Sequence, residues 1–77
     1  MNNTTLEIHA NNQPTVMERL LQVTRYRGFV INKLEMQQLG QTQLQVTMSV
    51  NSDRPIENLS RQLMKLFDVV DVSIVKS

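Results

Sequence analysis

The chain has 77 residues, carries eight basic against seven acidic side chains, and contains no cysteine. This length fits one small domain, residues 1–77, and leaves no room for a substrate cleft between two lobes. The net charge of +1 is too weak to recruit a polyanion by itself. Without cysteine there is no disulfide framework and no thiolate chemistry, which favours a reducing compartment.

The small size also bears on partners and location. A domain this short buries only about 60% of the surface of its unfolded chain, so we expect it to gain stability from association. The sequence shows neither a charged-then-apolar amino terminus nor a long uninterrupted apolar run. We therefore expect neither secretion nor a membrane-spanning segment, and we predict a soluble, cytoplasmic protein.

The amino-terminal third predicts a strand followed by a helix. Apolar and polar side chains alternate over residues 5–11, which is the period of a strand with one buried face. From Val16 onward the apolar residues repeat at helical spacing. Thr15 and Glu18 have the spacing of a capping box at the start of this helix. Gly28 can end it in the left-handed conformation.

The next apolar residues predict a strand with an irregularity. Phe29 and Ile31 share one strand face, whereas Leu34 and Met36 fall on the opposite parity. A β-bulge near residues 32–33 would bring both pairs to the same face, because it inserts one extra residue into the strand.

The rest of the chain predicts a turn, a strand, a helix and a last strand. Residues 39–41 supply the turn of a hairpin, and residues 44–50 alternate between apolar and polar without a break. Ser52 or Asp53 is available to cap the second helix. Residues 70–74 alternate again and form the final strand. The second helix is indicated by apolar residues at helical spacing, namely Ile56, Leu59, Leu63, Leu66 and Phe67.

The order βαββαβ predicts an α+β, ferredoxin-like sandwich, with a four-stranded antiparallel sheet and two helices on one of its faces. The other face of the sheet is predicted to be polar, so that water can cover it. On this face we place Thr5, Glu7, His9, Gln43, Gln45 and Thr47.

The sequence offers little for catalysis or metal binding. His9 is the sole histidine, whereas a metal site needs several ligands at suitable spacing. The carboxylates are scattered, and no nucleophile has a partner at a suggestive spacing. Gly28 and Gly40 are isolated and form no phosphate-cradling loop. We therefore expect neither an enzyme nor a metal protein.

The sequence favours neither of two further kinds of binding surface. RNA-binding domains of the same element order display aromatic residues on their central strands, but here Gln and Thr face outward, so we expect no nucleic-acid partner. Arg25 and Arg27 are better explained as cations that complement the helix dipole than as an electrostatic footprint. Four methionines are predicted to fill the core rather than to form an adaptable binding surface, namely Met17, Met36, Met48 and Met64.

Two segments carry a resemblance to a known family. Residues 12–19 read NQPTVMER, and residues 27–31 read RGFVI, followed by Leu34. They resemble the strings N-x-P-G-x-L-x-R and R-G-[FY]-N-I-x-x-L of the ACT regulatory domain. The resemblance covers essentially the whole chain. Among ACT proteins, the chain looks most like the small regulatory subunits of acetohydroxyacid synthase (acetolactate synthase), in the short form belonging to the second enterobacterial isozyme.

This resemblance implies a regulatory subunit in branched-chain amino acid biosynthesis. Such a module pairs its sheet edge with a second copy to form a homodimer. It also docks on the large catalytic subunit, which carries thiamine diphosphate, Mg²⁺ and FAD, so no cofactor is expected in this chain. The alternative is a free-standing homodimeric ACT module that senses an amino acid and acts on another enzyme or transporter.

The resemblance also implies an effector site for a branched-chain amino acid such as valine. Thr15 stands where the family usually has Gly, and its Cβ obstructs the approach of a carboxylate to the loop amides. Val30 stands where an Asn is usual, so a polar partner for the effector is replaced by an apolar branch. Feedback by valine is therefore expected to be weak or absent. The matching residues are Asn12, Gln13, Pro14, Thr15, Val16, Val30 and Ile31.

The same loop has a simpler interpretation as the entrance of the helix. Thr15 would then serve as its cap. Asn12 could bind a ligand through its amide, although Asn before a helix is more often hydrogen-bonded locally.

Overall fold

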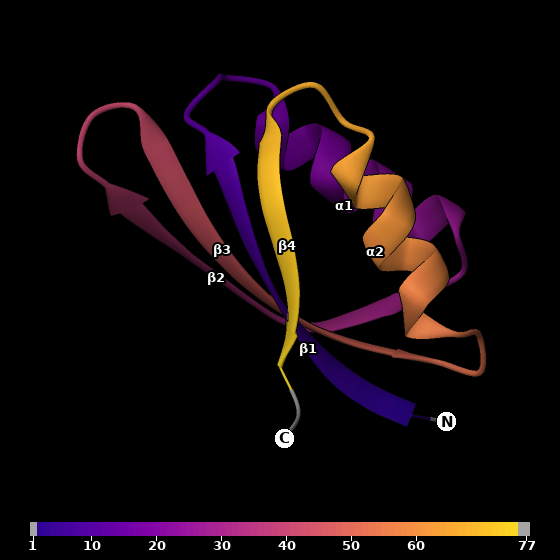
Figure 1. Cartoon of the computed structure of the whole chain (residues 1–77). Helices are drawn as coiled ribbons and strands as arrows, with labels where there is room; N and C mark the ends of the chain where they lie inside the picture. The colour runs from indigo at the N-terminus through magenta and orange to yellow at the C-terminus, as the bar shows by residue number, and fades with distance from the viewer. Residues whose placement is uncertain (1, 76–77) are drawn as a thin grey trace.

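Residues 2–75, which the computed structural model describes, fold in the predicted βαββαβ order. The four strands form one antiparallel sheet in the order β2-β3-β1-β4, and both helices lie on the same face of it (Figure 1). None of the helices in this range is both long and apolar enough to cross a membrane. The elements are β1 (Asn2–Asn11), α1 (Val16–Tyr26), β2 (Val30–Leu39), β3 (Gln43–Ser52), α2 (Ile56–Met64) and β4 (Val69–Val75).

The core lies between the helices and the two central strands. Alternate residues of β1 and β3 point toward the helices, because successive side chains of a strand face opposite sides. Thr24 of α1 is also fully buried, which the pattern of apolar residues did not indicate. Its hydroxyl donates to the Leu20 carbonyl at 2.7 Å, so this buried polar group has a hydrogen-bond partner. The buried apolar residues include Leu6, Ile8, Leu20, Val46, Met48, Leu59 and Leu63.

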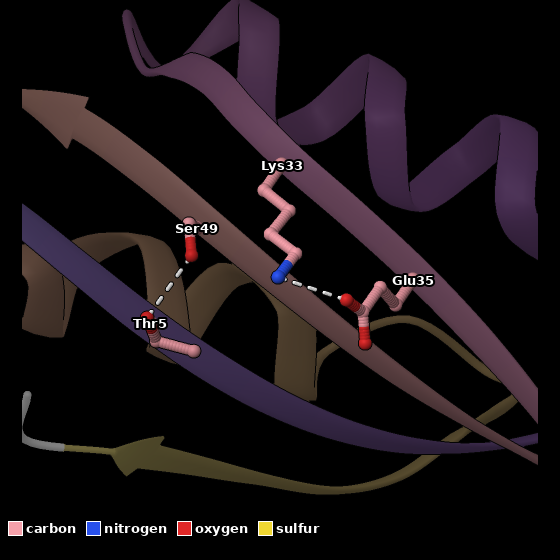
Figure 2. Close-up of polar contacts among 4 residues, drawn as sticks. All are labelled: Thr5, Lys33, Glu35 and Ser49. Atoms are coloured by element: carbon pink, nitrogen blue, oxygen red, sulfur yellow. Dashed lines mark hydrogen bonds and ion pairs between the residues drawn. The ribbon is translucent and has the colours of Figure 1, made fainter.

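The opposite face of the sheet is largely polar, as predicted. Thr5 of β1 and Ser49 of β3 form a hydrogen bond of 3.1 Å between their hydroxyl oxygens (Figure 2). On β2, Lys33 and Glu35 form an ion pair of 2.9 Å (Figure 2). The strand register places the predicted residues on this outer face, where cross-strand partners include Glu7 with Thr47 and His9 with Gln45.

The carboxyl end of α1 closes as predicted, whereas its amino end does not. Gly28 has a φ of +86°, its N–H donates to the Arg25 carbonyl, and the Phe29 N–H donates to the Thr24 carbonyl. These two bonds form a Schellman motif around a left-handed glycine. The predicted capping box is wrong. Thr15 has φ −99° and ψ −1°, outside the extended region usual for a cap, and its side chain makes no capping hydrogen bond.

The predicted caps of α2 are also wrong. The helix begins at Ile56 after Pro55, without a side-chain capping bond. A residue before proline is disfavoured in helical conformation, which moves the start of the helix beyond position 54. Ser52 has a different role, because its Oγ donates to the Gly28 carbonyl at 3.1 Å and accepts from the Arg54 N–H at 3.0 Å.

Two irregularities shape the strands. The register of β2 against β3 shifts between residues 31 and 33, which confirms the predicted bulge. The register of β4 against β1 shifts between residues 9 and 10, which the sequence pattern did not indicate. As a result, Val69 is buried, whereas Val70 is 49% exposed. The sequence pattern predicted that Val70 would lie on the same face as the other apolar residues of the last strand.

Several residues predicted to lie in the core are exposed. Met36 is 57% exposed because β2 is the edge of the sheet, although its register partner Val46 is fully buried. Met64 is 44% exposed, so the core interpretation of the methionines holds for Met48 but is wrong for Met36 and Met64. Phe67 is 96% exposed, because α2 ends at Met64 and the helical spacing no longer applies.

Candidate effector site

The predicted effector loop, residues 12–15, joins β1 to α1 at one end of the sheet (Figure 1). The Asn12 N–H donates to the Thr42 carbonyl at 2.9 Å, beside the turn between β2 and β3. The Asn11 N–H donates to the Asp68 carbonyl at 2.7 Å, in the connection between α2 and β4. The loop is therefore fixed against two neighbouring connections.

Much of the hydrogen-bonding capacity of this loop is already used internally. The Gln13 N–H donates to the Asn11 carbonyl at 2.8 Å, and the Val16 N–H donates to the Gln13 carbonyl at 3.1 Å. These amides, together with that of Asn12, are not available for a carboxylate while the loop keeps this conformation. A helix leaves its first N–H groups without intrahelical partners, and within residues 2–75 the N–H groups of Met17 and Glu18 donate to no carbonyl outside the helix. The predicted loop part of the site, residues 12–16, ends just before these two amides, although they lie within the matching string of residues 12–19.

The side chains of the loop differ in what they can offer a ligand. The side chains of residues 12–15 are exposed, whereas Val16 is 1% exposed and belongs to the core. Within residues 2–75 the Asn12 side chain forms no hydrogen bond, so its amide is accessible from solvent. Thr15 has a negative φ, so its Cβ causes no backbone strain there.

The other predicted residues, Val30 and Ile31, begin β2 but point to opposite faces of the sheet. Val30 pairs with Asn51 on the outer face and is 55% exposed. Ile31 pairs with Val50 on the helix face, where it packs against the core. Of the two side chains, only that of Val30 is largely exposed.

A single chain does not bring these two groups together. Asn11, at the start of the loop, pairs with Gln43, whereas Val30 pairs with Asn51 at the other end of β3. Eight residues of strand separate these levels, which corresponds to about 26 Å at a rise of about 3.3 Å per residue. A site that uses both groups must therefore draw them from two chains.

Among the side chains described, no group of three or more His, Cys, Asp or Glu residues is placed so that it could hold a metal ion. His9 lies on the outer face opposite Gln45 in β3 and Asp71 in β4.

Comparison with known proteins gives consistent matches. The ACT domain family matches residues 12–72. The small subunit of acetolactate synthase isozyme 2 from Escherichia coli K12 is 34% identical over 73 residues, which cover 94% of this chain and 84% of that protein. The corresponding subunit of Shigella flexneri matches with the same identity and coverage.

Solved structures share the fold. The acetolactate synthase small subunit of Thermotoga maritima matches with a TM-score of 0.80 and 24% identity, over 99% of this chain and 48% of that one. The ACT domain of the GTP pyrophosphokinase of Chlorobium tepidum matches with a TM-score of 0.82 and 11% identity, over 95% of this chain and 96% of that one. The chain therefore belongs to the ACT domain family, and over nearly its whole length it is similar to small subunits of acetolactate synthase.

Proposed function

We propose that this chain is a non-catalytic regulatory subunit that binds the large catalytic subunit of acetolactate synthase and activates or stabilises it. The observation that carries this proposal is the 34% identity to the Escherichia coli isozyme 2 small subunit over 94% of the chain. The pathway would be branched-chain amino acid biosynthesis. Thiamine diphosphate, Mg²⁺ and FAD would be held by the catalytic subunit and not by this chain.

We also propose that two copies associate through their β2 edges. An edge strand presents unpaired backbone N–H and C=O groups that can pair with another chain. The helix side of β2 adds exposed apolar surface, since Leu34 is 39% exposed and Met36 is 57% exposed. Pairing with a second copy would cover both features at once.

This pairing would also assemble the effector site. In a full antiparallel pair of β2 strands, the first residue of one strand lies beside the last residue of its partner. Val30 of one chain would then approach Leu39 of the other. The effector loop, residues 12–15, is held beside that same end through the hydrogen bond to Thr42.

The assembled site would bind a branched-chain amino acid weakly or not at all. The amides of Asn12, Gln13 and Val16 are engaged within the chain, and the side chain of Val30 has no polar atom. Burying a polar group without a hydrogen-bond partner costs roughly 2–7 kcal/mol. Burying the ammonium and the carboxylate of an effector in this site would be unfavourable by this amount. Feedback by valine is therefore expected to be weak or absent.

The proposal is tested by reconstitution with the catalytic subunit from the same source. The chain alone should form no acetolactate, and adding it should raise the activity of the catalytic subunit until the effect saturates. A Leu63→Asp variant, which places a charge in the core, serves as an unfolded control and should have no effect. Unchanged activity at saturating chain would contradict the proposal, and tight amino acid binding by the chain alone would then favour a free-standing sensor.

A further inference from the structure

A small pocket lined by arginines lies at the end of the molecule away from the effector loop. It lies between the connection that follows α1 and the outer face of α2, and its volume is about 140 Å³. Its described lining contains three guanidinium groups and two amide side chains but no carboxylate. The lining residues are Arg27, Phe29, Arg54, Asn58, Arg61 and Gln62.

The turn after α1 and the connection before α2 are locked together at this pocket. Ser52 joins them, because its Oγ bonds to the Gly28 carbonyl and to the Arg54 N–H. The guanidinium of Arg54 lies directly over Gly28, since a Cβ at that position would come within 2.9 Å of its Nε. The absence of a side chain at Gly28 is therefore what admits the Arg54 side chain to this position.

The second helix supplies the opposite wall. Asn58, Arg61 and Gln62 are three and four residues apart, so they share one face of α2. Arg27 enters from the end of α1, with its Cζ 5.6 Å from the centroid of the Tyr26 ring. A cation–π contact of this kind leaves the guanidinium N–H groups available as donors.

None of the three arginines forms an ion pair with a carboxylate inside residues 2–75. The pocket therefore brings together three positive charges that repel one another, and its described lining contains no carboxylate. Three of the eight basic side chains of the chain line this one pocket.

We propose that this arginine pocket binds the phosphate group of a small phosphorylated ligand. The planar donor fork of arginine matches phosphate oxygens in a bidentate manner. A phosphate monoester carries about −1.5 to −2 charges near neutral pH and offers three acceptor oxygens, whereas a carboxylate carries a single charge. Three arginines therefore favour phosphate over carboxylate.

The size of the pocket limits what enters it. Sites for complete drug-sized ligands measure about 300–1,000 Å³, so a pocket of about 140 Å³ suits a single anionic group. A second hollow of about 340 Å³ adjoins it and shares Phe29 and Arg54 in its lining. Asp53 and Glu57 border this second hollow, so it would accommodate the uncharged part of a ligand while the phosphate stays with the arginines.

The test is an NMR titration of the full isotope-labelled chain with inorganic phosphate, with sodium chloride added to keep the ionic strength constant. We expect saturable shifts of the backbone amides near Gly28, Arg54 and Asn58. Sodium acetate should bind at least about tenfold more weakly, because it carries less charge. Because the catalytic subunit is absent, the result is independent of the reconstitution experiment.

Matched variants locate the site. Arg61→Gln and Arg54→Gln should each weaken phosphate binding about tenfold, whereas Arg25→Gln removes the same charge from α1 outside the pocket and should leave binding unchanged. Arg61 is exposed on α2, so its variant keeps the test valid if Arg54→Gln unfolds the chain. Shifts that do not saturate, acetate binding as tight as phosphate, or equal losses for Arg25→Gln and Arg61→Gln would each overturn the proposal.

Discussion

Val30 of β2 lies opposite Asn51 of β3 on the outer face of the sheet, and the buried Oδ1 of Asn51 has no hydrogen-bond partner within residues 2–75. Directly opposite residues bring their Cβ atoms to about 4.5–5.5 Å, within reach of a short amide side chain. Leaving a buried acceptor unsatisfied costs about 1–3 kcal/mol. The Val30 side chain has no polar atom that could pair with this acceptor.

Val30→Asn should supply the missing donor to Asn51. The expected coupling between the two side chains is about 0.5–1.5 kcal/mol, which is the usual net value of a hydrogen bond. It is measured by urea unfolding of a double-mutant cycle that combines Val30→Asn with Asn51→Ala, because the cycle cancels the change in strand propensity. A coupling energy of zero would show that the amide of the substituted residue does not reach Asn51.

Gly28→Ala should destabilise the chain more than Gly40→Ala. Both glycines have positive φ, so each substitution introduces strain of about 1–2 kcal/mol. A Cβ at Gly28 would also displace Arg54, whereas a Cβ at Gly40 has no neighbour within 4 Å. The free energies of unfolding of the two variants, measured by urea denaturation, should therefore differ by the cost of moving Arg54.

An Arg54→Ala background provides the control for that comparison. With the guanidinium removed, the difference in cost between the two glycine substitutions should shrink, since the nearest neighbours of a Cβ at Gly28 are gone. If Gly28→Ala remains more damaging by the same margin in this background, the difference comes from the turn itself and not from Arg54.

The order of the elements and the faces of the strands could be predicted because burial leaves a periodic trace in the sequence. The unbroken alternation over β3 fixed its two faces, since a shift of one residue would expose every apolar side chain. The change of parity between Phe29 and Leu34 located the bulge for the same reason. These features depend on neighbours in the sequence.

Features that depend on the third dimension could not be predicted. Periodicity tells which way Met36 points but not that β2 lies at the edge of the sheet. Phe67 continued the helical spacing although the helix had already ended. The arginine pocket could not be predicted because its residues come from three segments of the chain. Of these residues, the sequence drew attention only to Arg27, which the helix dipole explains.

Met36→Lys should weaken the homodimer that we propose. It places a charge on the exposed apolar surface of the β2 edge, and lysine on an edge strand opposes pairing with another chain. Sedimentation analysis should show at least about a tenfold increase in the dissociation constant. Val70→Lys changes a similarly exposed residue on the other edge strand, β4, and should leave association unchanged. Equal effects of both variants would place the interface elsewhere.

Titration calorimetry with valine should give weak heat or none for the native chain, and Val30→Asn combined with Thr15→Gly should improve binding. We expect Val30→Asn to contribute the larger part of the gain in affinity. Thr15 has a negative φ, which any residue can adopt, so replacing it with glycine relieves no backbone strain. A hydrogen bond to a charged group of the effector is worth about 1.5–3 kcal/mol, which corresponds to roughly ten- to hundredfold in affinity. Val70→Asn introduces the same amide at an exposed valine outside the site and should change nothing. Tight binding of valine by the native chain would reverse this interpretation of both positions, because it would mean that the bonded loop amides open for the ligand.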